Sequence, residues 1–171
     1  MVNSSYDMAL IRIDNRLIHG QVLESWVPFV KAKSIMVVND NVACDLFSET
    51  VIRLAVQSEI EVIVSTVEDF AKDYSFQRDG GKKAIVLFAS IDDAYKAYKL
   101  GFHFNKLNIG NIYNEEYKLG YGASVFLCDN DIREILELLE NKGVMIEVRR
   151  IPMERAVNVK EVLKDYCQIT P

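Results

Sequence analysis

The sequence has few of the residues that cross-link or divide a chain. Its 171 residues include three cysteines, Cys44, Cys128 and Cys167, with no Cys-x-x-Cys pair. An odd number of widely spaced cysteines argues against a disulfide framework and fits a reducing compartment. Three prolines occur, and no stretch rich in Pro, Gly or Ser interrupts the chain. We therefore expect one domain, a size in keeping with roughly 100–200 residues per domain.

Long apolar runs and runs of positive charge are also missing. The longest uncharged stretch spans residues 119–128, whereas a membrane-spanning helix needs about 18 or more apolar residues. Residues 1–7 are polar and lack the apolar core of a secretory signal. Lys and Arg total 20 against 25 Asp and Glu, so the basic footprint of nucleic-acid binders is absent. These absences predict a cytoplasmic protein with no inserted segment and no nucleic-acid partner.

Metal and cofactor signatures are scarce as well. His19 and His103 are the two histidines, far apart in the chain, and they make a poor metal-ligand set. The chain has no P-loop motif, and Gly120 and Gly122 are not followed by the third glycine of a dinucleotide fingerprint. We expect neither a metal nor a cofactor.

Strand and helix patterns alternate along the whole chain. Several apolar runs are continuous rather than alternating, which is typical of strands covered on both faces. The expected strands are residues 9–13, 34–38, 61–64, 84–88, 106–109, 123–127 and 144–148. The expected helices are residues 21–26, 43–56, 66–73, 90–100 and 129–142. This alternation predicts a single α/β domain with a mainly parallel sheet of about seven strands and helices on both faces.

Ligands of open α/β sheets bind outside the carboxyl ends of the strands, so the residues that follow each strand are candidates. The first strand is followed by the richest segment, residues 14–21 (DNRLIHGQ). Polar or small residues also follow the second, fourth and fifth strands. We expect these to form the pocket rim: Asn39, Asp40, Ser90, Gly110 and Asn111.

His19 is the strongest candidate for chemistry, although a loop histidine bonded to the backbone is an equally simple alternative. Gly20 leaves the space beside it open, and the following helix offers free N–H groups to an anion. Arg12 and Arg16 add charge that pairs well with phosphate. Asp14 is either a turn residue or the carboxylate that holds the imidazole by one nitrogen. A nucleophilic histidine beside anion-binding groups indicates phosphoryl transfer through a phosphohistidine.

A resemblance supports this interpretation. Residues 11–22 (IRIDNRLIHGQV) closely resemble the phosphohistidine loop of the IIB component of the mannose/fructose/sorbose class of bacterial phosphotransferase system, or PTS. Trp26, residues 35–40 (IMVVND), residues 87–88 (LF), residues 108–110 (NIG) and residues 143–149 (GVMIEVR) are similar to further parts of that family. The resemblance covers residues 8–171, which we take as the IIB domain, and leaves residues 1–7 as an amino-terminal extension.

The resemblance implies that His19 accepts a phosphoryl group from a phosphorylated IIA component. The group would pass to a sugar held by the membrane IIC and IID components, with the protein peripheral to the membrane. Asp14 would orient the imidazole, and the phosphate would be contacted by Arg12, Arg16, Gly20 and Gln21. The chain departs from the family at Asn111, where a second glycine is common, and at Asn39, where serine is common.

Two other functions fit the same residues. One is a regulatory protein that is phosphorylated on His19 but takes no part in sugar transport. The other is a non-catalytic α/β domain that binds a small anion. The sequence does not separate these from the leading interpretation, nor does it identify the sugar.

Overall fold

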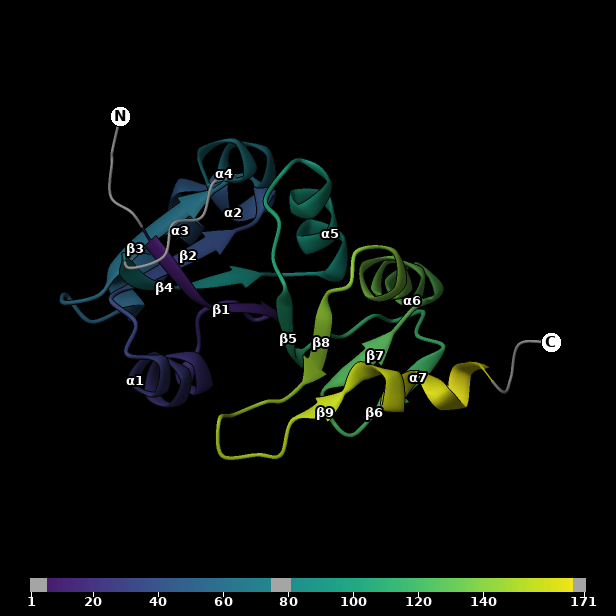
Figure 1. Ribbon diagram of the computed structural model, residues 1–171. Coiled ribbons are helices and arrows are strands. Elements are labelled where there is room, and N and C mark those ends of the chain that lie inside the picture. Colours follow the sequence, from purple (N-terminus) through teal and green to yellow (C-terminus); the bar gives the residue numbers. More distant parts are fainter. Residues whose placement is uncertain (1–5, 75–80, 168–171) are drawn as a thin grey trace.

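The computed structural model describes residues 6–74 and 81–167, and its centre is a seven-stranded sheet in the order β3-β2-β4-β1-β5-β8-β9 (Figure 1). Residues 1–5 of the expected amino-terminal extension lie outside the described residues, as does the side chain of Cys167. Within this sheet, all neighbouring strands are parallel except β8 and β9, which are antiparallel. The strands are β1 (Tyr6–Asp14), β2 (Ser34–Val38), β3 (Glu61–Ser65), β4 (Lys82–Phe88), β5 (Lys106–Asn111), β8 (Met145–Val148) and β9 (Val157–Asn158).

The α/β class, the single domain and the seven-stranded, mainly parallel sheet are confirmed, but one predicted strand is shorter than expected and lies outside the main sheet. The pattern over residues 123–127 yields only β7 (Val125–Leu127), which pairs antiparallel with β6 (Leu119–Tyr121) in a separate two-stranded sheet. Gly122, at φ +58°, provides the tight turn between them. The seventh strand of the main sheet is instead β9, which is too short to leave a pattern in the sequence.

Helices fill the connections, as expected, although several boundaries differ. The expected helix at residues 43–56 is α3 and begins three residues later, because the side chain of Asp45 caps its amino-terminal end. The short helix α2 precedes it and is capped by the side chain of Asn39. The segment after β1 is a π-helical turn, η1 (Gln21–Trp26), that continues into α1 (Val27–Val30). The remaining helices are α2 (Asp40–Ala43), α3 (Leu46–Ala55), α4 (Val67–Tyr74), α5 (Ile91–Lys99), α6 (Asp129–Leu136) with η2 (Glu137–Asn141), and α7 (Val159–Cys167).

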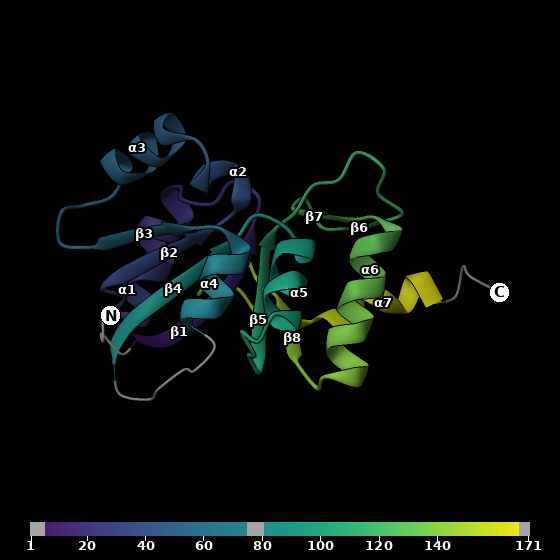
Figure 2. The ribbon, with the colours of Figure 1, turned by 90° about the horizontal axis from the view of Figure 1, so that it is seen from above.

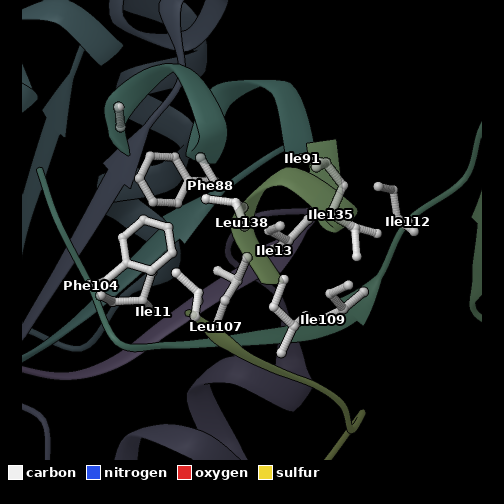
Figure 3. Packing of buried hydrophobic residues seen from close by; sticks show 14 of the residues in the cluster. Ile11, Ile13, Phe88, Ile91, Phe104, Leu107, Ile109, Ile112, Ile135 and Leu138 are labelled. Carbon is white, nitrogen blue, oxygen red and sulfur yellow. The ribbon is translucent and has the colours of Figure 1, made fainter. Parts of the chain in front are cut away.

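Apolar side chains pack on both faces of the sheet. β2 is buried throughout, with Met36 and Val38 in the larger core and Ile35 and Val37 in the smaller one. The larger core lies under α4, α5 and α6 (Figures 2 and 3). The smaller core lies under η1 and is closed by Trp26. This two-faced burial explains why the strands read as continuous apolar runs.

β1 occupies the middle of the sheet between β4 and β5. Ile11 and Ile13 point into the larger core, so Arg12 between them points to the opposite face, toward Trp26. Arg12, Asp14 and the loop that follows them therefore lie beside the carboxyl ends of β4 and β5.

Candidate active site

The loop after β1 is held by a tight turn and a buried side chain. The backbone N–H of Leu17 donates to the carbonyl of Asp14 at 2.8 Å. Leu17 adopts a left-handed conformation at φ 55°, which is costly for a residue with a Cβ. Its side chain is anchored in the smaller core. This anchor fixes the path of the loop and carries His19 back over the end of β1.

His19 and Asp14 form the central contact of the site. Nε2 of His19 lies 2.8 Å from Oδ2 of Asp14. The Asp14 carboxylate is fully buried, whereas the His19 side chain keeps 17% of its exposure. No described residue bonds to Nδ1 of His19. Nε2 thus fixes the imidazole ring to Asp14, and Nδ1 is left for a reaction partner.

Arg12 lies beneath this pair and is completely buried. Its Nη2 donates to Oδ2 of Asp14 at 2.9 Å, and its Nη1 donates to Oδ1 of Asn108 at 2.5 Å. The carbonyls of Arg149 and Arg150 accept further bonds from the two nitrogens. Burial lowers the pKa of Arg12 from its ordinary value, and the Asp14 carboxylate opposes that effect. Arg12 therefore holds Asp14 from below, and direct contact between Arg12 and phosphate stays a prediction.

Gly110 is buried and makes room for Arg12. A Cβ added to Gly110 would lie 1.8 Å from Nη2 of Arg12. The missing side chain thus lets the guanidinium lie flat against β5. Gly110 was predicted at the pocket rim. The structure shows it buried against Arg12.

Arg16 and Gln21 lie on the open side of the same carboxylate. The Arg16 backbone N–H and Nε donate to Oδ1 of Asp14 at 3.2 and 3.3 Å, and its Nη2 donates to Oε1 of Gln21 at 3.0 Å. The Arg16 side chain is 47% exposed. Gly20 is exposed and has no atom within 4 Å of the position of a Cβ. This side of the site accordingly has room and positive charge.

Asn111 ties the end of β5 to the loop. The backbone N–H of Asn15 donates to the Asn111 carbonyl at 3.0 Å, and the side-chain amide of Asn111 donates to Oδ1 of Asn15. Asn111 thus lies at the edge of the site, where the sequence placed it, and it steadies the loop that carries His19.

The other predicted rim residues make their hydrogen bonds at the starts of helices. Asn39 caps α2 and donates to Asp93 at 3.2 Å. Asp40 accepts from the backbone N–H of Val67, and Ser90 caps α5 by accepting from the backbone N–H of Asp93. Across the described part of the chain, no hydrogen bond or ion pair joins these caps to His19. A role for them at the rim stays a prediction.

Comparison with known proteins assigns the chain to a family. Residues 8–169 match the model of the PTS system sorbose subfamily IIB component. The chain belongs to that family. The fructose-specific EIIB component of Bacillus subtilis is 30% identical over 162 residues, covering 95% of this chain and 99% of that protein. The mannose-specific EIIAB component of Escherichia coli is 26% identical over 91% of this chain, which spans 48% of that longer protein.

Solved structures agree with the family assignment. The IIB domain of the sorbose permease from Klebsiella pneumoniae superposes with a TM-score of 0.82 at 28% identity, covering 94% of this chain and 97% of that one. ManxB from Thermoanaerobacter tengcongensis gives a TM-score of 0.85 at 28% identity, covering 96% and 99%. This chain is thus a IIB component of a sugar phosphotransferase system, which is a transferase.

The described residues contain neither a cluster of metal ligands nor a membrane-spanning helix. Among the described residues, no three His, Cys, Asp or Glu side chains gather where they could hold a metal ion. No helix in residues 6–74 and 81–167 is long and apolar enough to cross a membrane.

The groups that support Arg12 were not predicted from the sequence in that role. Asn108 bonds to the guanidinium, and Trp26 lies 5.3 Å from it and donates to the Arg150 carbonyl at 2.9 Å. A buried asparagine within the apolar run of β5 was the available signal, because a buried amide needs a polar partner. The carbonyls of Arg149 and Arg150 left no signal, since backbone groups carry no residue identity.

Proposed function

We propose that His19 of this IIB component is the phosphoryl carrier. It would accept the group from the phosphohistidine of a IIA component and pass it to a sugar bound by membrane IIC and IID components. The observation that carries the proposal is the 2.8 Å contact between Nε2 of His19 and Oδ2 of Asp14, which leaves Nδ1 as the presented nucleophile.

The transfer takes place in two steps. The lone pair on Nδ1 of His19 attacks phosphorus while the bond from phosphorus to the donor imidazole breaks, and that electron pair returns to the donor nitrogen. In the second step, a sugar hydroxyl oxygen attacks phosphorus and the bond to Nδ1 breaks, returning its pair to the ring. The hydroxyl proton leaves to solvent or to a base of the partner. Asp14 accepts a hydrogen bond from Nε2–H throughout and offsets the positive charge that the ring gains.

Arg16 is the group suited to the phosphoryl charge. Its guanidinium is 47% exposed, lies on the open side of Asp14 and is steadied by Gln21 at 3.0 Å. Phosphoryl transfer depends mainly on positioning and charge stabilisation, so one oriented cation on the open side of Asp14 is a substantial contribution. Gly20 leaves space for the phosphate and for the approach of the partner. Arg12 acts through Asp14 as a positioning residue.

Support for a IIA partner comes from the mannose-specific EIIAB relative, whose name joins an A and a B component in one chain. We therefore assign this protein to the cytoplasmic side of the transporter, peripheral to the membrane. The identity of the sugar would reside in the membrane components.

The test is intact-protein mass spectrometry after incubation with phosphoenolpyruvate, the general phosphotransferase proteins and a IIA component. Wild type and the His103→Ala control should each gain one acid-labile phosphate, and His19→Ala should gain none while keeping its fold. Phosphate on His19→Ala would overturn the assignment. No phosphate on wild type with several IIA components would favour a domain that binds an anion without turnover.

A further inference from the structure

A cavity lies toward the opposite end of β1 from the His19 loop. β1 and β5 pair only over the three register positions of Arg12, Ile13 and Asp14. Toward the start of β1 the two strands diverge (Figure 1). A cavity of about 370 Å³ occupies the divergence, lined by the edge of β1 from Tyr6 to Ile11, by the start of β5 and by β8. That volume is in the range of small-molecule sites, roughly 300–1,000 Å³.

One wall of the cavity is aromatic and carries a cation. Trp26 and Phe29 line it, with their rings edge to face at 5.9 Å. The Arg149 guanidinium carbon lies 5.6 Å from the Trp26 ring centre and 5.8 Å from that of Phe29. Stacking on two rings orients the planar guanidinium without neutralising it.

Arg149 differs from its neighbours in lacking an anionic partner. Arg12 is paired with Asp14, and Arg150 is paired with Glu154 at 2.5 Å. In the described part of the chain, no carboxylate pairs with Arg149, and its buried Nε has no acceptor. The Arg149 guanidinium therefore brings an unpaired positive charge to the cavity lining, which an anion supplied by a ligand would offset.

The acidic residues that line the cavity do not neutralise Arg149. Glu147 lines the cavity but is paired with Lys106 at 2.8 Å and accepts from Asn108 at 3.3 Å. Asp7 is the other carboxylate in the lining, and it belongs to the β1 edge rather than to the aromatic wall.

We propose that this cavity binds a small organic anion with a flat apolar body. The body packs against Trp26 and Phe29, and the carboxylate or phosphate accepts hydrogen bonds from Arg149. The site is separate from the His19 loop, and the proposal does not rest on phosphoryl transfer. Contact with Trp26, whose ring also faces Arg12 at 5.3 Å, puts the ligand next to a residue that supports the active site.

Trp26 is the one tryptophan of the chain, so its fluorescence reports directly on the aromatic wall. The wild type is titrated with benzoate, with phenyl phosphate, with inorganic phosphate and with benzyl alcohol as the uncharged counterpart of benzoate. The same titrations are run on Arg149→Met, which keeps an apolar stem, and on the matched control Arg155→Met, whose arginine is exposed and outside the cavity. Amide NMR spectra locate the response, and thermal unfolding checks that each variant is folded.

We expect benzoate or phenyl phosphate to change Trp26 fluorescence and to shift amides of β1 residues 6–11. Loss of one charge-assisted contact should weaken binding about tenfold in Arg149→Met and not in Arg155→Met. Benzyl alcohol and inorganic phosphate should bind more weakly than either aromatic anion. Equal affinity in Arg149→Met, equal affinity for benzyl alcohol, shifts confined to the His19 loop, or no response to any probe would each overturn the proposal.

Discussion

The carboxyl end of β1 and the carboxyl ends of β2 and β4 carry similar polar residues but use them differently. After β2 and β4, Asn39, Asp40 and Ser90 accept from backbone N–H groups at the starts of helices. After β1, Asp14 accepts from Arg12, Arg16 and His19 side chains. The first set completes helix ends, whereas the second gathers charge around one buried carboxylate and one presented imidazole nitrogen.

Polar residues that follow strands are therefore of two kinds, those that cap helices and those that bind other charged side chains. A side chain that satisfies a helix end is accounted for by local structure alone. A carboxylate that is fully buried and bonded to cations is not required by any helix and is costly to desolvate. Convergence of several charged side chains on one buried carboxylate, rather than position after a strand, distinguishes the site.

The largest contrast should appear when the two aspartates are neutralised. Asp14→Asn leaves the fully buried Arg12 without its carboxylate, so we expect a loss of about 3–5 kcal/mol in unfolding free energy together with loss of phosphate uptake. Asp40→Asn keeps an oxygen for the Val67 N–H and should cost about 1 kcal/mol or less. Urea unfolding and phosphorylation assays measure both. Similar losses in the two variants would erase the distinction.

A smaller contrast should follow from the two glycines. Gly110→Ala drives a methyl group into the Arg12 guanidinium, and overpacking of this kind costs about 1–3 kcal/mol. Displacement of Arg12 should also slow phosphoryl transfer. Gly20→Ala meets no atom within 4 Å and should leave stability within about 1 kcal/mol of wild type. Thermal unfolding and transfer rates test the pair, and a Gly110→Ala protein with normal rate and stability would contradict the role given to Arg12.

Removal of a cap should affect stability alone. Ser90→Ala deletes the acceptor of the Asp93 N–H at the start of α5 and should cost about 1 kcal/mol. Its rate of phosphate uptake should equal that of wild type. If the rate fell while the melting temperature held, Ser90 would belong to the site after all.

A pH-dependent effect concerns Glu134, a buried carboxyl group that no cation pairs with in the described part of the chain. Burial, with a contribution from Asp92 and Asp131, raises the pKa of Glu134 to about 7 from a reference of 4.5. The folded state thus binds this proton more tightly than the unfolded state. The stability it contributes is complete below pH 4.5 and is lost as the pH rises through about 7.

Glu134→Gln removes this titration and should flatten the fall in unfolding free energy between pH 4.5 and pH 8. Urea unfolding at several pH values measures it. An unchanged pH slope in Glu134→Gln would show that Glu134 does not titrate in this range.

Much of the architecture is readable from the sequence because burial on both faces leaves continuous apolar runs. The strands at residues 34–38 and 84–88 were predicted nearly as found. The order of the strands could not be predicted, because pairing between distant segments leaves no periodic pattern in the sequence. β9 could not be predicted because it has only two residues. The His19 loop was found because its charged residues adjoin in sequence. The contact of Asn108, which lies on β5, with Arg12 was found only in the structure.

The central claim is that Asp14 holds Nε2 of His19 and leaves Nδ1 to carry phosphate. The most direct test is ¹⁵N NMR of the histidine rings in the phosphorylated protein, which distinguishes phosphate on Nδ1 from phosphate on Nε2. The account predicts a phosphoramidate at Nδ1 of His19, with Nε2 still protonated and bonded to Asp14. Phosphate at Nε2 would require that contact to break and would contradict the account.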